Sequence, residues 1–347
     1  WLKRLSAHGA RDGACHAARR LPTLMAEAPA GEALAPVYQK LISRSPPGQL
    51  GDVLNCCRQL AGDSGLPPEV SLRACVENNE ANLLSVPLGN ESGGRGIVCD
   101  FARMGSRAHR EVIYVDPRTD MLFSVDQERQ ECTSVKPKPQ GNDIMAEMQK
   151  LNSDVAKPFH EALQREVDRY VAEHFPTEEG ATVCGLAYAN PGKEVGGNIE
   201  LRVYISSQRT RPRGLWAGNW TSQWRAVFTP GQQAPAKLAG IIEFKTFYAE
   251  DGNVHFRRKQ TKVSKVSETR DCQLFAAEFV KAIAHFEEDF HSHTEEVCET
   301  YGAGPLKAMR RLLPLAKERF DWRPFRHSLV RDMREAGKTA VEGHSAN

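Results

Sequence analysis

Apolar residues recur with a helical period near the start of the chain. Between Leu34 and Ile42, five of them fall at i, i+3, i+4, i+7 and i+8, the spacing of one helix face. The segment Ser45-Pro46-Pro47-Gly48 ends this helix, because proline cannot continue the hydrogen-bond ladder. A second apolar face then runs from Leu50 to Ala61. The short connection predicts an antiparallel helix pair within residues 34–85.

The segment 86–270 changes to the period of two that is typical of half-buried strands. Alternation is clearest at Ile199–Ile205, where apolar and polar residues take turns. Asp251-Gly252 is a strong hairpin signal, because glycine tolerates positive φ. Consecutive strands joined by short turns predict an antiparallel meander with one apolar face and one helix near 158–174. The predicted strands are 111–116, 121–125, 182–188, 199–205, 241–248 and 254–258.

The helical period returns in the segment 271–304. Six residues at alternating steps of four and three form a seam of heptad type, which predicts a long helix lying across the bare face of the sheet. They are Phe279, Ile283, Phe286, Phe290, His293 and Val297. A last helix is expected at 321–336, with Asp321 as its N-cap. The predicted fold class is α+β.

Composition places few limits on this chain. It has 347 residues, 40% hydrophobic and 26% charged, which is enough for about two domain-sized units. The nine cysteines are scattered without a C-x-x-C pair, a pattern typical of a reduced protein of the cytoplasm. Residues 1–33, rich in Ala, Arg and Gly, are expected to be a disordered extension. No cofactor or metal site is expected.

The distribution of charge is more informative than its sum. The net charge is +2, which argues against a protein wholly devoted to nucleic acid. The segment 305–338 holds ten Lys and Arg against four Asp and Glu, a net +6, so all other residues together carry −4. The segment 305–347 is therefore a basic amphipathic arm. Such an arm can bind an acidic protein surface, a partner groove or an anionic membrane, or pack on its own domain.

Three features could suggest other chemistry. His291 and His293 lie two residues apart on a helix, so their side chains diverge and do not share an ion easily. The glycine-rich segment 89–96 lacks the ending of a phosphate loop and is expected to be a loop. Trp216, Trp220 and Trp224 could stack on single-stranded nucleic acid, but their alternation favours core packing. We therefore do not expect an enzyme.

Two motifs resemble the signatures of the F-actin-capping protein alpha subunit family. Glu250-Asp251-Gly252-Asn253-Val254, preceded by Phe247-Tyr248, is similar to the family's hairpin signature H-Y-Y-E-D-G-N-V. Leu306 to Pro314 resembles its second signature, F-K-A-L-R-R-x-L-P. Four further matches lie in family order at Pro46-Pro47-Gly48, Asp116-Pro117-Arg118, Trp216 to Trp224 and Asp321-Trp322. The resemblance extends over about residues 34–336.

The resemblance implies a heterodimer with a similar beta subunit. A helical stalk would come from 34–85, half of a shared antiparallel sheet from 86–270, and a crossing helix from 271–304. A C-terminal "tentacle" helix would cap the barbed end of an actin filament independently of calcium, at the cytoplasmic cytoskeleton. The family also implies inhibition by anionic phosphoinositides.

The expected actin-binding residues lie in the arm. Its basic groups would meet acidic actin, and its apolar stripe would be buried there. They are Lys307, Arg310, Arg311, Lys317, Arg319, Trp322, Phe325, Leu329 and Met333. The alternative is that the arm is a membrane-surface or calmodulin-target helix on a diverged scaffold of the same family.

Overall fold

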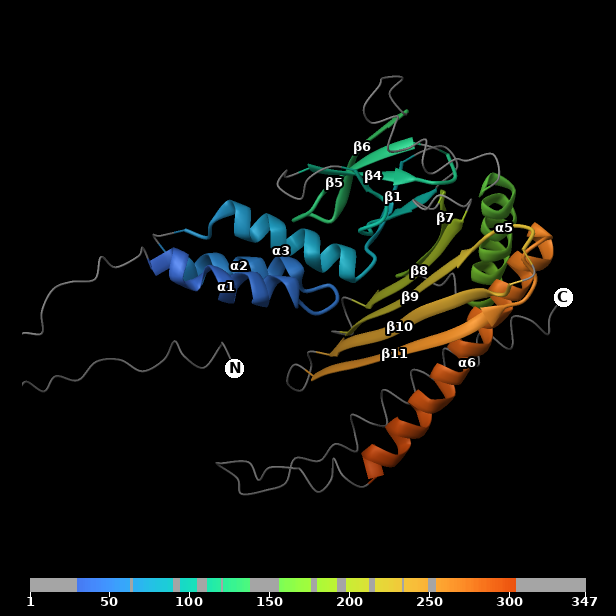
Figure 1. Ribbon diagram of the computed structural model, residues 1–347. Coiled ribbons are helices and arrows are strands. Elements are labelled where there is room, and N and C mark those ends of the chain that lie inside the picture. Colours follow the sequence, from blue (N-terminus) through green and yellow to red (C-terminus); the bar gives the residue numbers. More distant parts are fainter. Residues whose placement is uncertain are drawn as a thin grey trace, which may run out of the picture.

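The computed structural model describes residues 30–62, 65–89, 94–104, 111–119, 121–137, 156–175, 180–191, 198–211, 216–232, 234–248 and 254–303. Helices at the N-terminal end lead into a small β region and then into a five-stranded sheet covered by two helices (Figure 1). The predicted α+β class is confirmed. The arm at 305–347 lies outside the described residues, as does the predicted extension except for its last few residues.

Three helices form the N-terminal part: α1 (Ala30–Ser43), α2 (Leu50–Ala61) and α3 (Pro68–Ala81). The first two match the predicted pair, and both α2 and α3 contact α1. The third was not predicted. Its first residue is Pro68, a position that suits proline because the first helical N–H needs no partner within the helix.

The predicted apolar face of the first helix is only half buried. Tyr38 and Ile42 pack into a small core with residues of α2 and α3. Leu34, Val37 and Leu41 are instead 44%, 49% and 46% exposed. These three residues, at steps of three and four, form a stripe that no described part of the chain covers.

Two small sheets follow. One pairs β1 (Ser85–Pro87) with β2 (Arg95–Ile97); the other has the order β3 (Arg103–Met104), β4 (Glu111–Asp116), β5 (Met121–Asp126) and β6 (Glu131–Pro137). The predicted β4–β5 hairpin is confirmed. The prediction of a loop over 89–96 is wrong at its end, since Arg95 and Gly96 belong to β2. A Cβ on Gly96 would lie 2.7 Å from the ring of Phe123, so the close approach of this strand requires glycine.

The large sheet is the predicted antiparallel meander. Its order is β11-β10-β9-β8-β7, with every neighbour adjacent in the chain. The strands are β7 (Ala181–Pro191), β8 (Ile199–Arg211), β9 (Trp216–Phe228), β10 (Ala236–Tyr248) and β11 (Val254–Val266). The hairpin β10–β11 pairs over its whole length, from Ala236 opposite Val266 to Tyr248 opposite Val254. Both strands are longer than predicted.

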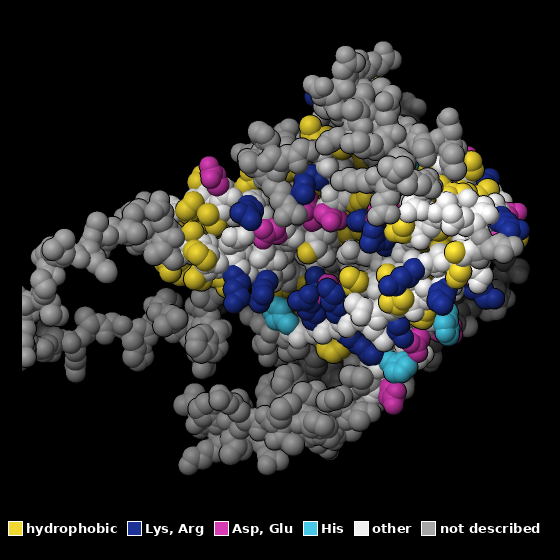
Figure 2. Space-filling view, in the orientation of Figure 1, with side chains coloured by type: hydrophobic (Ala, Val, Ile, Leu, Met, Phe, Trp, Pro, Cys, Tyr) yellow, Lys and Arg dark blue, Asp and Glu magenta, His cyan; other side chains and the backbone are white. Residues whose placement is uncertain are grey.

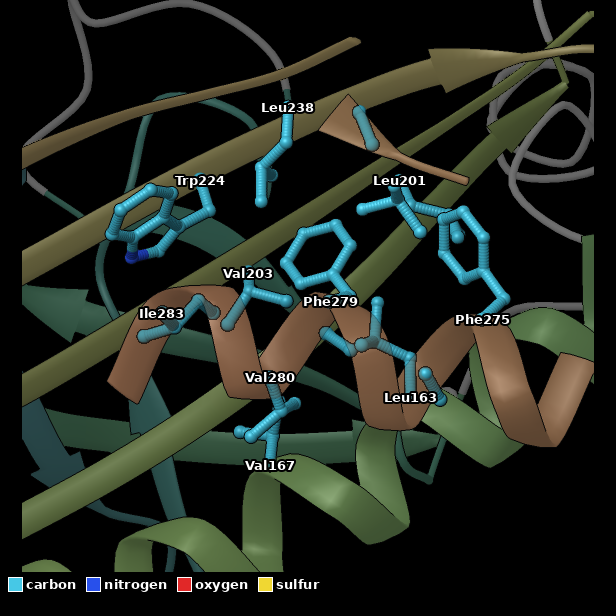
Figure 3. Close-up of a cluster of buried hydrophobic side chains, with 14 of the residues drawn as sticks. Leu163, Val167, Leu201, Val203, Trp224, Leu238, Phe275, Phe279, Val280 and Ile283 are labelled. Atoms are coloured by element: carbon cyan, nitrogen blue, oxygen red, sulfur yellow. The ribbon is translucent and has the colours of Figure 1, made fainter. Parts of the chain in front are cut away.

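Two helices, α5 (Ala156–His174) and α6 (Cys272–Ala303), cover one face of this sheet. Phe279 and Ile283 of α6 point towards the strands, whereas Val280 points towards Val167 of α5 (Figure 3). Burial of such apolar side chains is the main driving force of folding. Both helices occupy their predicted places, and α6 crosses the sheet as expected. None of the described helices is long and apolar enough to span a membrane.

Candidate functional site

The predicted interface residues of the arm lie outside the described residues. These are Lys307, Arg310, Arg311, Lys317, Arg319, Trp322, Phe325, Leu329 and Met333. Of the hairpin signature, Glu250 to Asn253 also lie outside, and Val254 begins β11 opposite Tyr248. The hairpin itself is confirmed. What the structure does describe is the platform from which the arm starts: helix α6 and the sheet beneath it.

Aromatic rings hold α6 on the sheet. The ring of Phe286 stacks on Trp224 with centroids 5.7 Å apart, and Phe290 meets Trp220 edge to face at 5.3 Å. Near the start of the helix, Phe275 stacks on Phe228 at 4.5 Å. Such pairs add to area burial and fix the direction of the helix. Trp220 and Trp224 are buried in this core, which confirms their interpretation as packing residues rather than a stacking platform.

Polar contacts tie α6 to its neighbours at a few points. The Tyr170 hydroxyl of α5 donates to the Glu287 carboxyl at 2.8 Å, and Lys262 of β11 forms an ion pair with Asp289 at 2.5 Å. The guanidinium of Arg258, also on β11, lies 4.9 Å from the centre of the Phe290 ring, at cation–π distance. The edge strand is thereby held to the same helix from which the arm continues.

Glu287 is a carboxyl buried beneath the helix. Only 3% of this residue is exposed. Burial raises the pKa of Glu287 to about 7, against the lowering effect of neighbouring hydrogen-bond donors. The group therefore exchanges its proton near neutral pH while remaining inside the packed layer between α5, α6 and β9.

One of the two histidines, His293, differs from its predicted place. His293 was placed in the seam, but it is exposed, and its Nδ1 lies 3.1 Å from the carboxylate of Asp289. His291 stacks on Trp220 with the ring planes nearly parallel. Their side chains thus have separate partners. Among the described residues, no group of three or more His, Cys, Asp and Glu could hold a metal ion.

Strand β11 is an edge strand. It pairs with β10 on one side and with no other described strand on the other. Its sequence, VHFRRKQTKVSKV, holds five Lys and Arg and no acidic residue. A row of unpaired backbone groups 13 residues long is a template for pairing with another chain. The sequence predicted the meander but not this length, because basic residues on both faces of β11 hide the alternation.

Comparison with known proteins identifies the family of this chain. A family model described as F-actin capping protein alpha subunit matches residues 38–332. The F-actin-capping protein subunit alpha of Caenorhabditis elegans is 24% identical over 286 residues, covering 82% of this chain and 92% of the relative. That of Arabidopsis thaliana is 26% identical over 292 residues, covering 83% and 88%.

A solved structure shares the fold. The homodimeric actin capping protein alpha subunit from Plasmodium berghei superposes with a TM-score of 0.60 at 20% identity. The match covers 75% of this chain and 90% of that one. At this identity the likeness concerns the fold alone.

Proposed function

The chain belongs to the F-actin-capping protein alpha subunit family, and from this premise we propose that it is one subunit of a dimer that caps the barbed end of actin filaments. The cap blocks subunit addition and loss by occupying the filament end, without a chemical step. The observation that carries the proposal is the family match over residues 38–332, which extends through the sheet and α6 into the arm. Its place is the actin cytoskeleton of the cytoplasm.

Two uncovered surfaces support a dimer. The outer edge of β11 can accept a strand from a partner and so extend the sheet. The exposed stripe Leu34, Val37 and Leu41 on α1 can pack against partner helices. Both surfaces lie on elements that the family match covers in whole or in part. A partner that covers both would remove the exposed edge and the exposed stripe together.

The charge of β11 favours a different chain over a second copy as the partner. Two antiparallel copies of a strand with five Lys and Arg and no acidic residue would bring cations close to cations across the junction. Like charges on directly opposite residues destabilise a sheet. A beta subunit with acidic residues on its edge strand avoids this repulsion. The heterodimer is therefore our proposal, and the homodimer is the second candidate because the Plasmodium berghei protein of similar fold is homodimeric.

The arm is the proposed actin-binding element. Its basic residues Lys307, Arg310, Arg311, Lys317 and Arg319 would steer it towards acidic actin and raise the association rate. Its apolar stripe would then slow dissociation, because interface burial acts mainly on the off-rate. The same cations make competition by anionic phosphoinositides a consequence of the proposal.

Charge reversal in the arm tests this proposal. The double variant Lys307→Glu and Arg311→Glu, co-expressed with a beta subunit, is expected to lose at least about tenfold in affinity for barbed ends. The matched control is Lys157→Glu with Lys281→Glu, which makes the same change of charge at exposed positions of α5 and α6. Elongation from barbed ends is the assay, and full capping by the arm variant would refute the contact assignment.

Co-expression separates the remaining candidates. The heterodimer predicts that the chain is captured as a one-to-one complex with the beta subunit and aggregates without it, whereas a stable dimer of the chain alone would establish the homodimer. Truncation before Pro305 should leave the complex assembled and abolish capping. The membrane or calmodulin alternative predicts instead that the complex binds anionic vesicles or calmodulin and has no effect on elongation.

A further inference from the structure

The face of the large sheet opposite α5 and α6 is partly open over β9–β11. Arg225, Lys237 and Val263 are exposed there, whereas Asn219, Thr221 and Glu243 are buried. Odd-numbered residues of these strands point to it, because side chains alternate along a strand and the even-numbered ones pack under the helices. At one end, Lys245 donates to Asn82, just beyond α3, at 2.8 Å. On the β8 side, Arg202 lies over the ring of Phe101. Lys and Arg side chains gather over these strands in Figure 2.

We call this surface the basic sheet face and define it by residues on β8–β11. They are Glu200, Arg202, Arg225, Lys237, Glu243, Lys245, Arg257, Lys259, Val263 and Lys265. Seven of them are basic and two are acidic. The face does not include α6, which lies on the other side of the sheet.

Cations stand directly opposite cations three times on the basic sheet face. The register places Arg202 opposite Arg225. It also places Lys245 opposite Arg257, and Lys237 opposite Lys265. Cβ atoms of directly opposite residues are about 5 Å apart, so each of these pairs is repulsive by itself.

Carboxylates of the chain compensate two of the three pairs. Glu200 lies 2.7 Å from Arg202 and 2.7 Å from Arg225. Glu243 pairs with Arg257 and lies 3.4 Å from Lys245. In both cases a single carboxylate bridges two cations from neighbouring strands.

The third pair has no such carboxylate. Lys237 and Lys265 are both exposed, and neither has an ion-pair partner among the described residues. Beside them, Val263 is 65% exposed and stands opposite Ala239. The position therefore combines two uncompensated cations with an apolar side chain two residues along the strand, about 7 Å away.

We propose that the basic sheet face docks an acidic, extended polypeptide segment of a partner protein. One carboxylate of that segment lies between Lys237 and Lys265, as Glu200 and Glu243 do at the other two pairs, and an apolar side chain covers Val263. A peptide fits better than an anionic membrane, because Glu200 and Glu243 already pair with four of the seven cations. This leaves Lys237, Lys259 and Lys265, a small cluster that suits one carboxylate rather than a broad field of lipid phosphates. This docking is separate from actin binding by the arm and does not rest on the proposed function.

Lys237→Glu is the decisive substitution. It removes one cation and places a carboxylate directly opposite Lys265. This carboxylate would pair with Lys265 and take the place that the proposal gives to a carboxylate of the partner segment. Lys237 lies on β10, inside the sheet edge, so assembly with a partner subunit is expected to be unchanged. Lys281→Glu is the matched control, since it makes the same charge change at an exposed position of α6 on the opposite side of the sheet.

The probe is a fluorescein-labelled peptide of alternating Glu and Val residues, titrated by anisotropy against the full-length protein co-purified with its beta subunit. The wild type and Lys281→Glu are expected to bind it equally, with affinity falling as salt rises, whereas Lys237→Glu loses at least about tenfold. The melting temperature of Lys237→Glu should equal or exceed that of the wild type, because a repulsive pair has become attractive.

Three outcomes would overturn the proposal. Equal binding by Lys237→Glu and the wild type would show that the lysine pair is not the site. An equal loss of peptide affinity in Lys281→Glu would show that the net charge of the protein, and not the lysine pair, determines binding. Binding that depends on Lys237 to vesicles containing phosphatidylserine, with none to the peptide, would assign the face to a membrane instead.

Discussion

Replacing Glu287 by Gln should change how the stability of this protein depends on pH. The carboxyl lies between α5, α6 and β9 with 3% exposure, and burial raises its pKa from the ordinary 4.5 to about 7. Gln has the same shape and keeps an oxygen that can accept from the Tyr170 hydroxyl. It has no proton to lose, so it reports what the titration of Glu287 contributes.

The magnitude follows from linkage between proton binding and folding. Below pH 4.5 the carboxyl is protonated in both the folded and the unfolded state and contributes no pH dependence. Between pH 4.5 and about 7 the unfolded state loses the proton while the folded state keeps it, so the free energy of unfolding falls as pH rises. At about 1.4 kcal/mol per pH unit, the total loss is about 3 kcal/mol and is complete above pH 7.

The assay is urea unfolding of the complex at fixed protein concentration, followed by tryptophan fluorescence from pH 4 to 8. We expect the free energy of unfolding of Glu287→Gln, relative to the wild type, to rise by about 3 kcal/mol over this range. Groups common to both proteins cancel in the difference. The control is Glu288→Gln, an exposed neighbour on α6, expected to stay within about 0.5 kcal/mol of the wild type. A difference for Glu287→Gln that is constant with pH would refute the reasoning.

Two further substitutions test the packing of the sheet. Gly240→Ala would place a Cβ 2.1 Å from the Trp224 ring. It should lower the free energy of unfolding, measured in urea, by about 1–3 kcal/mol. The control Gly51→Ala lies in open space on α2 and should not destabilise the protein. A stable Gly240→Ala would mean that Trp224 can move aside. Asn82→Ala removes the acceptor of the Lys245 ammonium, 2.8 Å away, and should cost about 1–3 kcal/mol by the same measurement. Lys245→Met alone and with Asn82→Ala completes a double-mutant cycle, and additive effects would show that the contact contributes nothing.

The sequence was sufficient to predict those helices and hairpins whose pattern lies within one short segment of the chain. The seam of α6 was visible because Phe279, Ile283 and Phe290 repeat within one helix, and all three are buried. The β10–β11 hairpin was visible because the Asp-Gly turn lies next to its own strands. The family was evident from short motifs, two of which fall outside the described residues.

Helix α3 was missed because its buried residues are partly polar and give no continuous apolar stripe. Asn78, Asn79 and Glu80 are all buried, and distant partners satisfy them: Asn78 donates to the backbone of Ser43, and Asn79 to that of Gln127. An apolar stripe is the signal that sequence patterns provide for a buried helix face. In the last turn of α3, hydrogen bonds to residues far along the chain take its place.

By itself, the sequence determined the order of helices and strands, the family and the separation of a basic arm from an acidic remainder, because periodicity, turn chemistry and charge are properties of neighbouring residues. Only the tertiary structure decided which residues meet. It set Tyr170 against Glu287, left the Leu34 stripe of α1 uncovered, and placed Lys237 opposite Lys265 without a carboxylate. Such pairings depend on strand register and on the packing of distant segments, which a one-residue shift would alter without changing local propensity.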